Sequence, residues 1–444
     1  MRGARDLRLS RPDRLAEGRA GAAGTGQHGQ SGRTGRSARL VKGTQDMDIV
    51  ERIKAEFPQI AEVMSKVPET FAPDWLMASA VQETGLDDFG PDTFREPLER
   101  LCASINEDAD LNPYGRLLFA SVIRNQLGNR LLLQDTRKNT PERLSEPLVP
   151  PIIVTGLPRT GTTFLHRLLA ADPAHASLPF WQLNRPIPRN AEDTKEKRIA
   201  DVEALLDVRR KVTPELDGTH LIRAEAPEEC LHMTGVSGFT RLYWNLGPVY
   251  SFQRWLSRVD KADKYRDYVD LLHYLQGEYP GKRLVLKAPD HNDGVAELLD
   301  ALPEARVILT HRDIVEQIGS FLSLGRTTRK LAVNALDTAK EAEGVIDMTD
   351  VSLQKMAEAR IRHPDRILDV RYTDMMADPL ASVERIYEFC GLTLAKSRRD
   401  AIAEHHARNP KGKHGKHEYS LAEFGLENDW VRDRYKDYVA EFVD

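Results

Sequence analysis

The stretch PIIVTGLPRTGTTFLHRLLAA, residues 151–171, decides the fold of this chain. Its first part, 152–154, is a β-branched run bounded by proline and glycine, which is typical of a buried strand. The apolar residues after position 163 recur at helical spacing. A strand, a glycine-containing turn and a helix in this order present backbone N–H groups and a positive helix end to an anion. The segment therefore predicts a phosphate-binding loop, and an ordinary strand-to-helix turn is the plainer alternative.

The loop inside this stretch carries groups that suit an oxyanion. Gly156 and Gly161 allow positive φ and a close approach of the backbone to the anion. Arg159 supplies a planar cationic fork, and neighbouring threonines supply hydroxyls. The spacing of the glycines is that of a Walker loop, but Thr162 stands where that pattern requires lysine. We assign the anion contacts of this loop to Arg159, Thr160, Gly161, Thr162 and Thr163.

The sequence GLPRTGTT followed by an apolar helix resembles the 5′-phosphosulfate loop of the sulfotransferases, in particular a bacterial branch of that superfamily. The resemblance extends from about residue 85 to the end, and LDDFG and FREPL also resemble the leader region of that branch. It implies 3′-phosphoadenosine-5′-phosphosulfate (PAPS) as co-substrate and transfer of a sulfuryl group to an acceptor hydroxyl. It also implies an α/β fold with a P-loop-like parallel sheet flanked by helices.

Composition narrows the class of protein. The chain has 444 residues, of which 41% are apolar and 30% charged, as is usual in globular proteins. Residues 1–42 hold ten Arg/Lys and three Asp/Glu, a net charge of +7, so the total of −5 leaves −12 on the remainder. An acidic body argues against nucleic-acid binding. Cys102, Cys230 and Cys390 lie far apart, as free thiols in the reducing cytoplasm would. No apolar run is long enough for a transmembrane helix.

Three regions follow from the pattern along the chain. Residues 1–46 form an Arg/Gly-rich leader that we expect to be disordered, and we expect Met47 to be the true start. The apolar pattern of residues 47–148 predicts helices. We prefer a packing or dimerisation role for these helices, so a homodimer is one expectation. Residues 149–444 alternate strands with helices and predict a parallel sheet, with long helices over 250–279 and 330–361.

Ligands of parallel sheets bind beyond the carboxyl ends of the strands. Arg159, Lys287, Arg312 and Tyr372 each follow a predicted strand, so we expect them on one rim. The resemblance assigns Arg312 and Ser320, eight residues apart, to the 3′-phosphate, although a surface pair of Arg312 with Asp313 is the plainer alternative. It places Tyr372 near the adenine. It also makes Lys411, Gly412 and Lys413 a loop that closes over the 3′-phosphate, which is otherwise a solvated charge run.

Sulfuryl transfer is an in-line displacement that depends on positioning and on cationic stabilisation. Arg159 and Lys287 are the candidates for the leaving-group side. In the cytosolic sulfotransferases a histidine follows the corresponding lysine after two residues, whereas here His291 comes four residues after Lys287. His291 is the first candidate for the general base, and Glu228 or Glu229 is the second. We expect no metal.

The acceptor is left open. An aromatic segment, 239–279, suits a small-molecule, lipid or glycan hydroxyl acceptor, and nothing in the sequence chooses among them. A nucleotide kinase or NTPase is the first alternative to a sulfotransferase, and the missing Walker lysine argues against it. A nucleotide-binding protein without turnover is the second.

Overall fold

The computed structural model describes residues 48–216, 222–408 and 420–444. Our expectations for the leader 1–46, for Met47 and for Lys411, Gly412 and Lys413 concern residues outside this description. Within it, five parallel strands form a sheet in the order β2-β3-β1-β4-β5. The strands are β1 (Ile152–Gly156), β2 (His175–Ala176), β3 (Arg283–Lys287), β4 (Arg306–His311) and β5 (Ile367–Arg371). The predicted parallel sheet of an α/β fold is confirmed.

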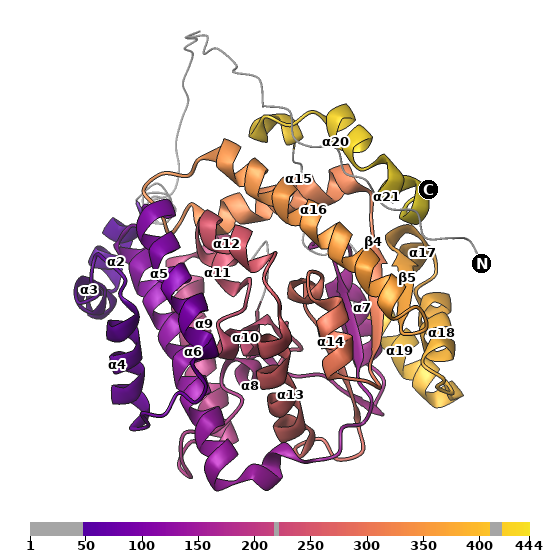
Figure 1. Cartoon of the computed structure of the whole chain (residues 1–444), viewed down its shortest axis with the longest axis horizontal. Coiled ribbons are helices and arrows are strands. Elements are labelled where there is room, and N and C mark those ends of the chain that lie inside the picture. The colour runs from indigo at the N-terminus through magenta and orange to yellow at the C-terminus, as the bar shows by residue number, and fades with distance from the viewer. Residues whose placement is uncertain (1–47, 217–221, 409–419) are drawn as a thin grey trace, which may run out of the picture.

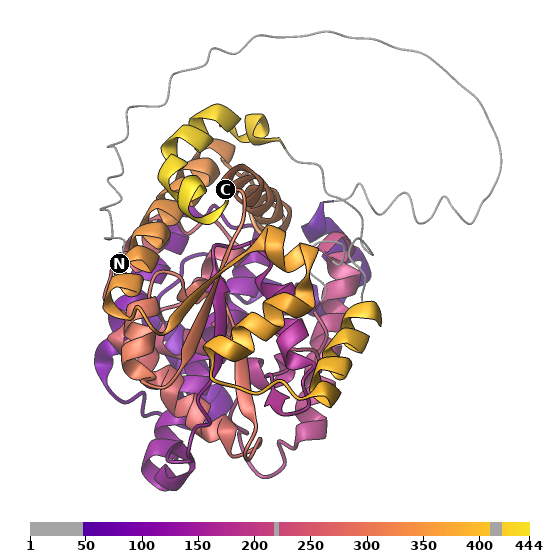
Figure 2. The same ribbon diagram turned by 90° about the vertical axis from the view of Figure 1, so that its right-hand side faces the viewer.

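The alternation of side chains along β1 explains why helices cover both faces of the sheet. Ile152 and Val154 pack with α7 (Thr162–Ala170), α18 (Pro379–Phe389) and α19 (Lys396–Arg408) on one face. Figure 2 shows α18 and α19, orange to yellow, in front of the strands. Ile153 faces the other way, and the core on that side includes residues of four helices. These are α13 (Ala262–Gln276), α14 (Val295–Ala301), α15 (Ile314–Arg329) and α16 (Thr338–Arg362).

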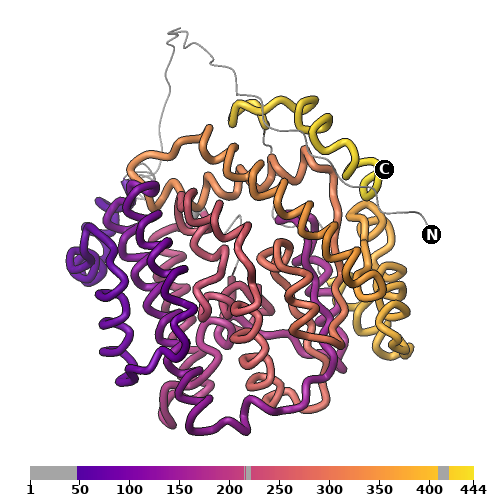
Figure 3. The backbone as a smooth tube through the Cα atoms, viewed as in Figure 1, coloured from indigo at the N-terminus to yellow at the C-terminus, as the bar shows by residue number. Residues whose placement is uncertain are grey.

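A group of N-terminal helices lies on the side of the molecule opposite α18 and α19 (Figures 1 and 3, indigo to purple). It comprises α2 (Ile49–Glu56), α3 (Pro58–Ser65), α4 (Pro73–Thr84), α5 (Arg95–Asp108) and α6 (Pro113–Asn139). Its own apolar core joins α4, α5 and α6 to α12 (Tyr250–Leu256), which ties it to the rest of the chain. No helix among the described residues is long and apolar enough to cross a membrane.

Two long helices differ from our prediction: one is split in two, and the other begins later. The predicted helix 250–279 is split into α12 and α13. Lys261 Nζ donates to the carbonyls of Leu256 and Val259 at 2.9 and 3.2 Å, and so satisfies the end of α12. The predicted helix 330–361 begins only at α16, where the side chain of Asp337 accepts hydrogen bonds from the first turn, as a helix N-cap does. The preceding helix, α15, instead continues to Arg329.

Candidate active site

The phosphate loop joins β1 to α7, and its conformation requires glycine at two positions. Gly156 has φ 141°, and a Cβ there would lie 2.6 Å from the carbonyl oxygen of Thr310. Gly161 has φ 91°, and a Cβ there would lie 2.7 Å from Cε of Met375. Arg159 also adopts positive φ, 71°, which is uncommon outside glycine and is typical of ligand-binding loops. The loop thus lies against β4 at Gly156 and against side chains of α17 (Tyr372–Ala377) at Gly161, with no room for a Cβ at either position.

The residues expected on one rim do lie together. Arg312 Nη1 donates to the carbonyl oxygen of Arg159 at 3.0 Å, and its guanidinium lies 4.7 Å from the ring centre of Tyr372. Arg159 Nε in turn donates to Ser320 Oγ at 3.0 Å. The guanidinium of Arg312 also pairs with Glu316 at 2.6 Å. Two arginines, an aromatic ring and a serine hydroxyl therefore surround the mouth of the phosphate loop.

Two of the predicted contact residues have internal partners. The Thr160 side chain is fully buried, and its hydroxyl lies 2.7 Å from the Leu157 carbonyl oxygen and 2.6 Å from Thr310 Oγ1. Thr160 therefore braces the loop from within. Ser320 is 8% exposed and holds Arg159. By contrast, Arg159, Gly161, Thr162 and Thr163 border the cavity described below.

Lys287, at the end of β3, connects the phosphate loop to the opposite wall. It is 1% exposed, and its Nζ lies 3.2 Å from Thr163 Oγ1 and 2.5 Å from a carboxylate oxygen of Glu229. The neighbouring Glu228 is buried, and its carboxylate accepts a hydrogen bond from the backbone N–H of Glu229 at 3.0 Å. Both glutamates border the cavity. The sequence-predicted lysine and glutamates are thus in one place.

His291 lies behind the cavity wall. It is fully buried, packs on Tyr265 and Tyr268, and places Nδ1 3.3 Å from the Tyr265 hydroxyl. It ends the short 3₁₀ turn η5 (Pro289–His291), in which the two residues before it border the cavity and its own ring turns towards α13. Burial, together with the nearby Lys264 ammonium, lowers the pKa of His291 well below 6.5. The structure does not bring the first candidate base to the reaction site.

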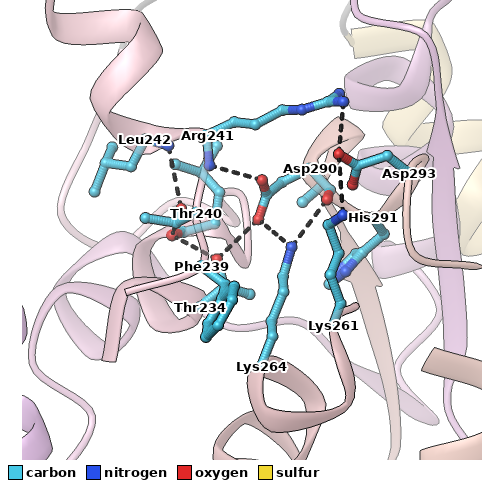
Figure 4. A network of polar contacts seen from close by, with 12 residues as sticks. Thr234, Phe239, Thr240, Arg241, Leu242, Lys261, Lys264, Asp290, His291 and Asp293 are labelled. Atoms are coloured by element: carbon cyan, nitrogen blue, oxygen red, sulfur yellow. Dashed lines mark hydrogen bonds and ion pairs between the residues drawn. The ribbon is translucent and has the colours of Figure 1, made fainter. Parts of the chain in front are cut away.

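The turn that carries His291 is fixed by a buried ionic network (Figure 4). Asp290 accepts hydrogen bonds from Lys264 Nζ and from the backbone N–H of Arg241, both at 2.8 Å. The guanidinium of Arg241 pairs with Asp293 at 2.8 Å, and Lys261 Nζ lies 3.5 Å from the same carboxylate. Because each buried charge has a partner, the network holds η5 rigidly beside the end of β3.

A cavity of about 730 Å³ extends from the phosphate loop. One end is polar and is bordered by the loop, Arg312 and Tyr372. The rest is mostly apolar, and part of it belongs to the N-terminal helices, for which we expected a packing role, and to α9 (Lys195–Val212). The apolar residues from these helices are Ile60, Leu117, Leu118, Leu205, Leu206, Val208 and Val212.

Two groups on this wall were not predicted from the sequence. His232, in α10 (Leu231–Thr234), borders the cavity three residues after Glu229, and its backbone N–H donates to the Glu229 carbonyl oxygen at 3.4 Å. Its ring packs against Phe180 at 4.9 Å. Arg329, at the far end of α15, also borders the cavity. Within the aromatic segment 239–279, Trp244 reaches the cavity while Phe239 and Phe252 lie in the core of the N-terminal region.

Comparison with known proteins agrees with this arrangement. A family model described as "Sulfotransferase family" matches residues 150–396, more than half of the chain. The omega-hydroxy-beta-dihydromenaquinone-9 sulfotransferase Stf3 of Mycobacterium bovis is 26% identical over 256 residues, which cover 56% of this chain. The chain spans 65% of the length of that relative, and Stf3 of Mycobacterium tuberculosis matches equally.

Two solved structures have the same fold over most of the chain. The sulfotransferase STF1 from Mycobacterium tuberculosis is 33% identical with a TM-score of 0.74, over 83% of this chain and 99% of that one. The sulfotransferase STF9 from Mycobacterium avium is 29% identical with a TM-score of 0.73, over 83% and 96% of the two chains. With its phosphate loop, parallel sheet and matched core, the chain belongs to the sulfotransferase family.

Proposed function

We propose that this chain transfers the sulfuryl group of PAPS to a hydroxyl of an elongated, largely apolar acceptor. The observation that carries the proposal is the position of Lys287. Its ammonium contacts Thr163 of the phosphate loop at 3.2 Å and Glu229 of the cavity wall at 2.5 Å. One cation therefore stands between the place for an anionic donor and the place for an acceptor.

The donor end suits a nucleotide with two anionic groups. The glycine loop and the start of α7 offer backbone N–H groups, and Lys287 and Arg159 lie beside them. Arg312 and Ser320 flank the second position, where we place the 3′-phosphate, and Tyr372 lies under the Arg312 guanidinium. The cofactor roles of these residues, and of Lys411, Gly412 and Lys413, are part of this proposal.

The chemistry assigned to the chain's own residues is positioning, charge stabilisation and proton removal. As the acceptor oxygen bonds to sulfur, the bond from sulfur to the phosphate oxygen breaks, and Lys287 with Arg159 stabilises the charge on the leaving oxygen. Glu229 takes the proton of the acceptor hydroxyl, because its carboxylate borders the cavity and is held in place by Lys287. His291, behind the wall, positions the η5 turn in this scheme.

The shape of the cavity supports a long acceptor. Arg312, which we place beside the donor, and Arg329 both border the cavity from opposite ends of α15. At a rise of about 1.5 Å per residue this helix spans about 24 Å, so the cavity extends well beyond the donor end. The name of the relative Stf3 gives a hydroxylated menaquinone derivative as its acceptor. An apolar molecule with a terminal hydroxyl fits the cavity of this chain better than a glycan does.

The test is sulfuryl transfer from radiolabelled PAPS to hexadecan-1-ol dispersed in detergent, with glucose as the polar comparison. We expect label on hexadecan-1-ol and none on glucose. Glu229→Gln should lower the rate by about 10²–10⁴-fold while binding of adenosine 3′,5′-bisphosphate stays unchanged. Glu225→Gln is the matched control, because Glu225 is exposed and lies four residues before Glu229 in the sequence. A full rate in Glu229→Gln would contradict the assignment of the base.

A further inference from the structure

The far end of the cavity holds a buried ion pair. Arg329 of α15 and Glu341 of α16 are both 0% exposed and pair directly. The Tyr250 hydroxyl donates to the same Glu341 carboxylate at 2.8 Å. A buried ion pair is weak support for stability, because the loss of hydration opposes the attraction between the charges. Because Arg329 borders the cavity, we looked to ligand binding for the function of this ion pair.

Two hydrogen-bond donors at this pair have no partner among the described residues. They are Nη1 of Arg329 and the indole Nε1 of Trp244, and both atoms are buried. The Arg329 guanidinium lies 4.2 Å from the centre of the Trp244 ring, so the two donors belong to one place. Both residues border the cavity. Buried donors of native proteins are almost always satisfied, which indicates that a ligand supplies the missing acceptor atom.

The backbone makes room for these two side chains. A Cβ at Gly325 would lie 2.1 Å from Arg329 Nη2, and a Cβ at Gly344 would lie 2.7 Å from Cη2 of Trp244. Gly325 itself borders the cavity, so the guanidinium that covers it lies on the cavity wall. The Arg329 side chain therefore runs back along α15 towards Gly325 and lies at the cavity rather than extending into solvent.

We infer that Arg329 and Trp244 form a subsite for a carbonyl-type oxygen of the acceptor, remote from the hydroxyl that receives the sulfuryl group. The inference deepens the proposed function and rests on it. The subsite offers donors, so its ligand atom is a hydrogen-bond acceptor. Glu341 already neutralises the guanidinium, so an uncharged ketone or ester oxygen fits better than a carboxylate. The subsite lies at the opposite end of α15 from Arg312, which we place beside the donor, so its ligand is a second oxygen function away from the reacting hydroxyl of the acceptor.

The experiment compares two probes of equal length in the full chain, with adenosine 3′,5′-bisphosphate bound. The probes are hexadecan-1-ol and 16-hydroxyhexadecan-2-one, and calorimetric titration measures their Kd. We expect the ketone to bind about tenfold more tightly. Trp244→Phe, which keeps the aromatic ring, should weaken binding of the ketone more than binding of hexadecan-1-ol and so reduce this preference several-fold. The double variant Arg329→Gln, Glu341→Gln should do the same without leaving an unpaired buried charge.

Trp255→Phe is the matched control, because Trp255 packs on Phe239 and Phe252 away from the cavity and should keep the full preference. Equal binding of the two probes by the wild-type chain, or binding of neither, contradicts the subsite. So does an undiminished preference in Trp244→Phe. The two proposals fail separately: sulfation of hexadecan-1-ol without a ketone preference overturns only the subsite, whereas a ketone preference without sulfuryl transfer overturns only the activity.

Discussion

The Lys287 ammonium lies 2.5 Å from a carboxylate oxygen of Glu229 and 3.2 Å from the hydroxyl of Thr163, which belong to opposite sides of the site. This bridge exists because the carboxyl end of β3 lies beside that of β1, in the register Val154 with Lys287. A side chain that follows one strand can therefore reach the loop that follows the next. In the mechanism that we propose, the lysine acts on the leaving group and also orients the glutamate.

Replacing Lys287 should affect the rate of transfer more than the binding of nucleotide. We expect Lys287→Met to lower kcat by about 10²–10³-fold, as removal of one preorganised charge-stabilising group does in other transferring sites. Affinity for adenosine 3′,5′-bisphosphate, measured by calorimetry, should change much less. Lys282→Met is the control, because Lys282 is exposed just before the same strand and should leave both quantities intact. A normal kcat in Lys287→Met would remove this residue from the mechanism.

The two arginines at the loop should determine nucleotide affinity. Arg159→Ala and Arg312→Ala each remove a charge-assisted donor, for which a loss of about 1.5–3 kcal/mol, or roughly 10–100-fold in Kd, is expected. Arg167→Ala, an exposed residue of α7, is the comparison and should bind nearly as the wild type does. Unchanged affinity in both of the first two variants would show that the anion binds elsewhere.

Gly161 gives a test of the loop geometry itself. Gly161→Ala adds a Cβ 2.7 Å from Met375 at φ 91°, so both steric overlap and backbone strain are expected. Gly281→Ala isolates the second effect, since Gly281 has φ 71° and open space around it. Thermal unfolding should show a loss of about 1 kcal/mol for Gly281→Ala and a larger one for Gly161→Ala. Equal losses would mean that the close approach of the loop to Met375 carries no cost.

Acid should destabilise the fold partly through one buried histidine. Burial, reinforced by the Lys287 ammonium, lowers the pKa of His166 from 6.5 to about 3. Protonation therefore favours the unfolded chain, so this contribution to stability is complete above pH 6.5 and is lost as the pH falls towards 3. Urea unfolding measures the free energy of unfolding, and between pH 6 and 4 its slope against pH should be smaller in His166→Gln than in the wild type by about 1.4 kcal/mol per pH unit. Equal slopes in the two proteins would contradict a lowered pKa of His166.

The sheet and the polar end of the site could be predicted because their signals are local. The β-branched run 152–154, the glycines of the loop and the polar residues that follow each strand together specify a parallel sheet with one functional rim. The residues that form the apolar wall of the cavity carry no such local pattern in the sequence. Leu117 of α6 and Val208 of α9 look like ordinary apolar positions of amphipathic helices, and only the packing of distant segments makes them part of the cavity wall.

The orientation of the His291 side chain could not be predicted from the sequence either. His291 lies in the expected segment, but η5 turns its ring towards Tyr265 and directs Pro289 and Asp290 to the cavity. A four-residue spacing after Lys287 does not reveal which way such a turn points. The pairing of Glu229 with Lys287 likewise depends on how the segment before α10 packs against the end of β3.

Whether the nucleotide site takes PAPS rather than ATP is tested most directly by calorimetric titration of the full chain with adenosine 3′,5′-bisphosphate and, separately, with ATP and Mg²⁺, without any acceptor. We expect tight binding of the bisphosphate, because cations flank two anion positions, and weak binding of ATP, because the loop lacks the Walker lysine. Preference for ATP with Mg²⁺ would contradict the assignment of the site to PAPS and would favour a nucleotide kinase or NTPase.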